Sequence, residues 1–262
     1  MFDYADDKIT INYIANRRNI LLLDGFGTRR LLFDPDKTPA EAIYESLKRY
    51  SFRLVLRDVI KYRSGIHAEM LTPFIDRDTA QKMLEEIAGM SVIRPAGNGS
   101  FILERNHIES FGDTLEWFIA TILKREFGAH AGWSIKLQTP GVGGDYDVLA
   151  LIENNLVYIE TKSSPPAHIE QASMAEFCLR VETIRPAMAA VLVDTHLRMK
   201  DKIVPAVEHV FRSRGYNCNM SRLSGEIFHF KHCLYVLNSK SDLISNLKKV
   251  IADFLTHKNY FL

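Results

Sequence analysis

Two acidic residues and one lysine in the second half of the chain have the types and spacing for metal-assisted chemistry on a phosphate ester. Asp147 opens an apolar run, and Glu160 and Lys162 end a second apolar run with Thr161 between them. Carboxylate and peptide-carbonyl oxygens are the ligands that Mg²⁺ or Mn²⁺ prefers. A lysine beside such a metal can hold or deprotonate a water, or neutralise charge that develops on a phosphate.

The two apolar runs predict neighbouring strands that bring these residues together. A tight turn near Asn154 joins the runs. Alternate side chains of a strand share a face, so Glu160 and Lys162 point the same way and Thr161 offers that face only its backbone carbonyl. Pairing around the turn places residue 147 roughly opposite residue 160 or 161. We therefore expect Asp147 and Glu160 to converge.

The order of the surrounding elements predicts an α/β domain. Helical periodicity over residues 111–128 precedes three strand-like runs, and a second helical segment at 167–184 leads to the continuous apolar run 187–194. This order of helix, three-strand meander, helix and strand is typical of an α/β sandwich around a mixed sheet. Further helices and strands follow, and they extend the domain to the end of the chain.

The spacing of the acidic residues resembles the motif of a known family. Asp147, twelve intervening residues and then Glu160-Thr161-Lys162 resemble the PD-(D/E)xK nucleases, which have the restriction-endonuclease-like fold. The resemblance covers about residues 111 to 194. The chain departs from the written motif because it has no proline before its aspartate, and Asp145 also precedes the strand. We prefer Asp147, since an apolar run follows it directly as in many family members, and Asp145 remains an auxiliary candidate.

The resemblance implies a divalent-metal-dependent endonuclease that hydrolyses phosphodiester bonds, with DNA favoured over RNA as the substrate. Its cofactor would be Mg²⁺ or Mn²⁺. By the same resemblance, Asp147 and Glu160 hold the metal together with the Thr161 carbonyl, and Lys162 positions or activates the attacking water. Asp147 and Glu160 are therefore candidates both for catalysis and for metal binding.

Two further residues enter through the resemblance. Many members add a glutamate from the first core helix as a metal ligand, and Glu116 is the candidate here. Gln171 matches a polar position that many members place near the scissile phosphate. An ordinary helix-boundary glutamate and a solvated glutamine are the alternative interpretations, so both residues are catalytic candidates that rest on the family pattern.

The chain changes character near residue 108, and we expect two domains over 1–108 and 109–262. The first part opens with strand-like runs, of which 19–25 and 28–34 read as a hairpin. Residues 8–14 read as a further strand. Two helices should follow, the first beginning with Thr38 as its N-cap and the second ending near Arg63.

Residues 66–104 predict a winged-helix-like module. Two helical segments, the second over 76–90, precede two short strands around a turn rich in glycine. Helix, helix and two-stranded wing is the order of this helix-turn-helix variant. The module would read DNA or contact a partner protein.

Several residues of the first part are candidates for nucleic-acid contacts. One set recurs every four residues, as a stripe that could follow a phosphate backbone, and the other lies on the helix that would enter the major groove. A solvated charged face is the alternative for the stripe. The candidates are Arg49, Arg53, Arg57, Lys61, Arg77, Gln81 and Lys82.

The amino-acid composition limits the classes of protein to which the chain can belong. The 262 residues are 47% apolar and 25% charged with a net charge of +1, which is ordinary for a globular protein. Three cysteines without a CxxC pair argue against a disulfide framework and a cysteine-rich zinc site. The histidines, among them His229 and His232, show no HxxxH or HxH spacing, and we assign them no role. No run suits a membrane span or signal peptide, so we expect a cytoplasmic protein without membrane contact.

The competing hypothesis is a non-catalytic protein. In it the winged-helix region binds DNA or a partner protein, and the nuclease-like domain is a scaffold. A degenerate scaffold should have lost at least one motif residue, whereas Asp147, Glu160 and Lys162 are all present. A homodimer and a monomer both remain open.

Overall fold

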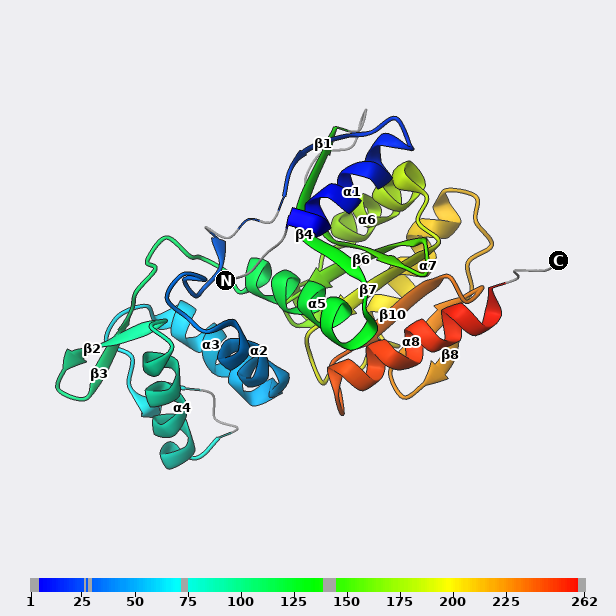
Figure 1. Cartoon of the computed structure of the whole chain (residues 1–262). Helices are drawn as coiled ribbons and strands as arrows, with labels where there is room; N and C mark the ends of the chain where they lie inside the picture. The colour runs from blue at the N-terminus through cyan, green and yellow to red at the C-terminus, as the bar shows by residue number, and fades with distance from the viewer. Residues whose placement is uncertain (1–4, 26, 28–29, 72–74, 139–144, 259–262) are drawn as a thin grey trace. The chain divides into compact units, whose positions relative to one another are not determined.

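The protein is a mixed α/β structure of two compact units (Figure 1). The computed structural model describes the following residues: 5–25, 27, 30–71, 75–138 and 145–258. Of the described residues, those within 27–118 form the first unit, and those within 5–25 and 119–258 form the second. This division differs from the predicted boundary at residue 108, because the N-terminal segment packs with the second unit and residues 109–118 pack with the first.

One mixed sheet organises the second unit. Its described residues form eight strands in the order β1-β4-β5-β6-β7-β10-β9-β8. The strands are β1 (Leu21–Asp24), β4 (His130–Gln138), β5 (Tyr146–Ile152), β6 (Asn155–Lys162), β7 (Met188–Val193), β8 (Ser221–Ser224), β9 (Ile227–Phe230) and β10 (Leu234–Asn238). An antiparallel meander of β4, β5 and β6 is followed by β7, which runs parallel to β6, and by β10, which runs parallel to β7.

Helices cover both faces of this sheet (Figure 1). They are α1 (Ala5–Asn16), the second half of α5 (Gly112–Phe127), α6 (Gln171–Ile184), α7 (Ile203–Ser213) and α8 (Leu243–His257), with a short 3₁₀ turn η3 (Pro166–His168) before α6. The predicted order of helix, three strands, helix and strand is confirmed as α5-β4-β5-β6-α6-β7. No helix among the described residues is long and apolar enough to cross a membrane.

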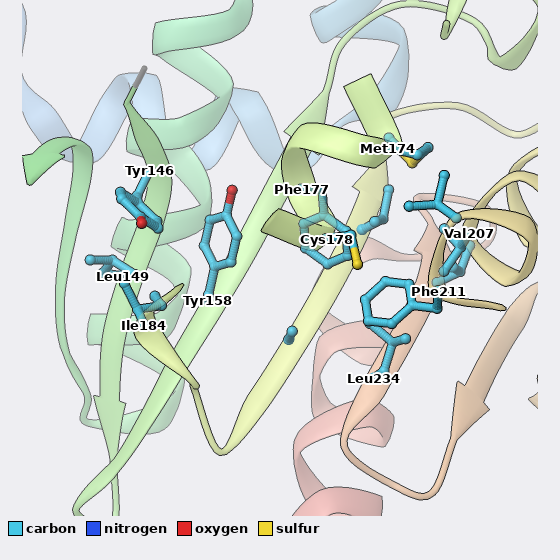
Figure 2. Packing of buried hydrophobic residues seen from close by; sticks show 14 of the residues in the cluster. Tyr146, Leu149, Tyr158, Met174, Phe177, Cys178, Ile184, Val207, Phe211 and Leu234 are labelled. Carbon is cyan, nitrogen blue, oxygen red and sulfur yellow. The ribbon is translucent and has the colours of Figure 1, made fainter. Parts of the chain in front are cut away.

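An apolar cluster lies between the sheet and α1, α6 and α7. In Figure 2 the aromatic side chains of Tyr146, Tyr158, Phe177 and Phe211 follow one another through this cluster. Tyr158 meets Tyr146 edge-on at 5.3 Å between ring centroids and lies 5.6 Å from Phe177. The cluster fixes α6 against β6 and thereby sets which α6 side chains reach the end of that strand.

The N-terminal segment is helical, although the sequence predicts a strand over residues 8–14. α1 buries Ile11, Ile14 and Ala15 against the sheet, while Ile9 and Tyr13 remain exposed. Burial at positions three and four apart is the period of a helix. The β-branched residues favour a strand locally, and packing against β4 overrides that preference.

β1 also differs from its prediction, because it does not form a hairpin with the run at 28–34. It pairs antiparallel with β4, where Leu21 lies opposite Gln138. Leu32 and Phe33 are buried in the first unit instead, and the Leu32 N–H donates to the Thr114 hydroxyl at 2.9 Å. Residues 28 and 29 of the predicted hairpin lie outside the described residues. The two halves of the expected hairpin therefore belong to different units.

The first unit contains the predicted helices and wing. Its elements are α2 (Ala40–Lys48), α3 (Tyr50–Tyr62), the 3₁₀ turn η2 (Ala68–Met70), α4 (Arg77–Gly89), β2 (Ile93–Gly97) and β3 (Ser100–Leu103), followed by the first half of α5. β2 and β3 pair antiparallel, and Asp76 caps α4 by accepting from the Thr79 N–H. The first helical segment expected after residue 66 is only the short turn η2. Thr38 does not cap α2; its hydroxyl donates to the Met90 carbonyl at 2.7 Å.

Candidate active site

A two-residue turn sets the register of β5 against β6. Glu153 and Asn154 separate the strands, with φ of 45° and 62°. Turns with two positive φ values match the twist of antiparallel strands, and asparagine adopts this conformation more readily than most residues. The pairing continues without a shift to Val148. One step further, Asp147 comes opposite Glu160, which is one of the two registers that the sequence leaves open.

The backbone and side chain of β6 hold Asp147 in place. Its Oδ2 accepts the Thr161 N–H at 2.7 Å and the Thr161 hydroxyl at 3.3 Å. Within the described residues, Oδ1 has no hydrogen-bond donor. The structure thus joins Asp147 to the motif strand, while Asp145 accepts from Ser134 on β4 at 3.4 Å.

Thr161 contacts Asp147 through its side chain as well as its backbone. Strand alternation predicts that the side chain points away from the acidic residues, but its hydroxyl and its N–H both donate to Asp147. The N–H and C=O of one residue in an extended strand point to the same side. The Thr161 carbonyl is therefore directed toward β5 as well, which is the direction that a third oxygen ligand requires.

Glu160 is buried and accepts hydrogen bonds at both oxygens. Its side chain is only 2% exposed. Lys162 Nζ donates to Oε1 at 2.7 Å, and an Arg180 Nη donates to Oε2 at 3.1 Å. The Tyr158 hydroxyl also donates to Oε2. Burial, with the neighbouring Glu160 charge, raises the pKa of Tyr158, which keeps its hydroxyl protonated as a donor.

Arg180 and Tyr158 are the residues that sequence reasoning missed. Arg180 lies on α6 three residues after the buried Phe177 and four before the buried Ile184, on the apolar face of the helix. A buried arginine needs a charged partner, because an unpaired buried charge is strongly destabilising. The arginine at an apolar helix position was thus a readable signal that an acidic partner lies beneath the helix.

The surroundings of Asp147 shift the pKa of its carboxyl group. Burial, followed by the charge of Glu160, raises the pKa of Asp147 to about 7, although the Thr161 N–H, Lys162 and Arg180 oppose this shift. Half-buried Asp147 and buried Glu160 repel each other, and a bound cation would stabilise both carboxylates.

This raised pKa predicts a pH dependence of stability. Asp147 binds a proton more tightly when folded than when unfolded, so its contribution is full below about pH 4 and is lost as pH rises through about 7. Asp147→Asn should therefore increase the free energy of unfolding at pH 8 by about 1–3 kcal/mol and leave it nearly unchanged at pH 4. Urea unfolding at the two pH values measures this. An equal effect at both would show that Asp147 titrates normally.

Glu116 and Gln171 are the remaining predicted catalytic residues. Glu116 is half-buried on α5, in the part of that helix that belongs to the first unit. Its role as a ligand stays a prediction. Gln171 is exposed at the first turn of α6, about 13 Å along the helix from Arg180. It lines a shallow pocket with His168 and Lys202.

The expected basic stripe is not an exposed face. Arg53 is 1% exposed, and its guanidinium donates to the Leu47 carbonyl at 2.6 Å. Arg49 forms an ion pair with Glu86. Arg57 is half-buried with its guanidinium over the Phe111 ring. Residues four apart on a helix rotate by about 40° at each step, so the stripe passes from exposed Arg49 through buried Arg53 and returns to the surface at Lys61.

Lys61 and the residues of α4 remain at the surface. Lys61, Arg77 and Lys82 are exposed and Gln81 is half-buried. Arg77 forms an ion pair with Glu69 at 2.6 Å, and the Gln81 amide donates to Glu85 at 2.9 Å. These four residues stay predictions for nucleic-acid contact, but acidic partners engage two of them.

Comparison with known proteins bears on the fold alone. Neither any protein-family model nor any curated protein matches the chain. Among solved structures, protein VC1899 from Vibrio cholerae matches at 12% identity and a TM-score of 0.53, over 94% of this chain and 60% of that one. Can2 from Sulfobacillus thermosulfidooxidans, in complex with cyclic tetra-adenylate, matches at 12% identity and a TM-score of 0.52, with the same coverage. The chain thus spans about 60% of the length of either protein.

Proposed function

We propose that the protein is a divalent-metal-dependent nuclease whose active centre comprises Asp147, Glu160 and Lys162. The observation that carries the proposal is their convergence at the ends of β5 and β6. Asp147 is hydrogen-bonded to the residue after Glu160, and Lys162 contacts Glu160 at 2.7 Å. The element order α5-β4-β5-β6-α6-β7 supports a restriction-endonuclease-like core, which is the fold that the motif implies.

The donor set fits a hard divalent cation. Asp147 offers Oδ1, which has no donor within the described residues, and its raised pKa reflects a negative charge that lacks full compensation. Glu160 and the Thr161 carbonyl supply further oxygens, which Mg²⁺ or Mn²⁺ prefers. A bound cation would provide a Lewis acid at the phosphate. Binding would require Glu160 to loosen its contacts with Lys162 or Arg180.

The residues of the chain then have separate tasks. Thr161 orients Asp147, and Arg180 with Tyr158 fixes the carboxylate of Glu160 from the α6 side. Lys162 is 25% exposed at its side chain, so its ammonium can leave Glu160 and contact a phosphate oxygen or a water. Positioned charge of this kind stabilises the negative charge that grows on a phosphate during hydrolysis.

Replacement of Lys162 tests the proposal most directly. Lys162→Ala removes the positive charge but retains both carboxylates, so metal binding should persist while cleavage slows by about 10²–10⁴-fold. Cleavage of plasmid and single-stranded DNA, and of RNA, with Mg²⁺ or Mn²⁺ measures the rate, and calorimetry measures metal binding. The matched control is Lys248→Ala, at an exposed lysine of α8. Equal loss of cleavage in both variants would contradict a specific role for Lys162.

A non-catalytic scaffold is the second candidate function, and one observation favours it. Both oxygens of Glu160 are already satisfied by Tyr158, Lys162 and Arg180, as in a purely structural ion cluster. The two functions differ in their response to metal. A folded protein that binds no divalent cation and cleaves no nucleic acid under any of these conditions would support the scaffold.

A further inference from the structure

A second group of metal-ligating side chains lies in the same unit, remote in sequence from the proposed active centre. His229 is on β9 and His232 is in the loop that leads to β10. Asp253 and His257 lie one turn apart on α8, which packs over this hairpin. His229 and His232 show no HxxxH or HxH spacing in the sequence, which therefore assigns them no role.

The hairpin and the helix bring the four side chains together. His229 pairs across the strands with Tyr235, whose hydroxyl donates to Asp253 at 2.7 Å. His232 has a positive φ of 52° in the loop, which turns its ring back over the hairpin. Its ring lies 4.1 Å from that of His229 and 3.7 Å from that of His257, measured between centroids.

The separations between the donor atoms suit a small cation. Ligand atoms of His229, His232 and Asp253 lie within 4.8 Å of one another. His232 Nδ1 is 2.8 Å from one Asp253 oxygen, and His257 Nδ1 is 3.2 Å from the other. Ligands of a tetrahedral zinc are separated by about 3.3 Å, so the ligand atoms of His229, His232 and Asp253 lie close to the spacing that a bound ion requires.

The available ring nitrogens also suit metal binding. Among the described residues, the Nε2 atoms of His229, His232 and His257 have no hydrogen-bond partner.

We infer that His229, His232 and Asp253 form a zinc site that joins the β9–β10 hairpin to α8, with His257 beside Asp253 on the helix. Two imidazole nitrogens and one carboxylate oxygen favour Zn²⁺ over the hard cations expected at Asp147 and Glu160. The fourth position of a tetrahedral zinc would be left to water. The bound ion would replace the hydrogen bonds that now connect the loop to the helix, and it would stabilise this edge of the sheet.

Metal titration of the whole chain tests this site separately from the nuclease proposal. The protein is stripped with a chelator and titrated with Zn²⁺, and with Co²⁺ as a spectroscopic probe. We expect one equivalent to bind, with the intense visible absorption of tetrahedral Co²⁺ and a raised melting temperature. The variant Asp147→Asn should bind this equivalent unchanged, which separates it from a metal at the proposed active centre.

Variants of the ligands complete the test. Removing a residue that only supports a ligand commonly weakens metal affinity about 10–100-fold, so His257→Gln, next to Asp253, should weaken Zn²⁺ binding by about that factor. His229→Ala removes a ligand and should weaken it by at least about 100-fold. His209→Ala, at an exposed histidine of α7, is the matched control and should bind as the wild type does. Circular dichroism of each metal-free variant verifies folding. Absence of Zn²⁺ binding by the wild type, or unchanged affinity in His229→Ala and His257→Gln, would overturn the inference.

Discussion

Replacement of Asp147 by asparagine is expected to abolish divalent-metal binding at the proposed active centre and to reduce DNA cleavage by at least about 10³-fold, because metal stabilisation of the transition state contributes several kcal/mol. Asparagine retains an oxygen for the Thr161 N–H, so the strand ends should keep their arrangement. The variant removes the half-buried one of two mutually repelling carboxylates. Calorimetric titration with Mn²⁺ and a plasmid-cleavage assay measure the two effects.

The matched control for this substitution is Asp145→Asn. Asp145 occupies the same approach to β5 but accepts from Ser134 on the neighbouring strand. We expect a small effect on cleavage from Asp145→Asn, and a large one would make Asp145 an auxiliary ligand. Cleavage that persists in Asp147→Asn would place the active centre elsewhere in the chain.

Replacement of Arg180 by methionine should produce the largest loss of stability. The Arg180 side chain is 9% exposed and donates to Glu160, which is 2% exposed. Removing one partner of a buried ion pair leaves the other charge poorly compensated, at a cost of about 3–5 kcal/mol. Lys162 still contacts Glu160, so we expect a loss of about 3 kcal/mol. Urea unfolding at neutral pH measures it.

A nearby surface ion pair provides the comparison. Arg214 contacts Glu182 of α6 at 2.6 Å, with side chains 39% and 24% exposed. Surface pairs contribute about 0–1 kcal/mol, so Arg214→Met should have at most that effect. Restoring neutrality with Arg180→Met and Glu160→Gln together should recover much of the loss. If Arg180→Met is no more destabilising than Arg214→Met, Arg180 does not compensate Glu160.

Local chemistry in the sequence was sufficient to identify the core of the candidate site. The sequence predicts a tight turn near Asn154 and leaves two registers open, and the positive φ of Glu153 and Asn154 in the structure selects the one observed. Because strands alternate their side chains, the register alone brings Asp147 opposite Glu160 and puts Lys162 beside it. Hydrophobic periodicity also predicted the order of α5, the β4–β6 meander, α6 and β7, because the type of each element depends on residues that are close in sequence.

Only the tertiary structure decided which partners come from distant segments. The N-terminal run 8–14 has a strand-like composition, yet packing against β4 makes it helical and moves it into the second unit. The sequence pattern predicts that Arg53 is at the surface, but the packing of α3 buries it.

Dependence on contacts between distant segments also explains why the sequence did not reveal Arg180 or the cluster around Asp253. Arg180 meets Glu160 across the packing of α6 on β6, and Asp253 meets His232 across the packing of α8 on the β9–β10 hairpin. These contacts depend on how apolar faces fit together over long sequence separations. Side-chain spacing along the chain records the period of each helix and strand, but it does not record which faces meet.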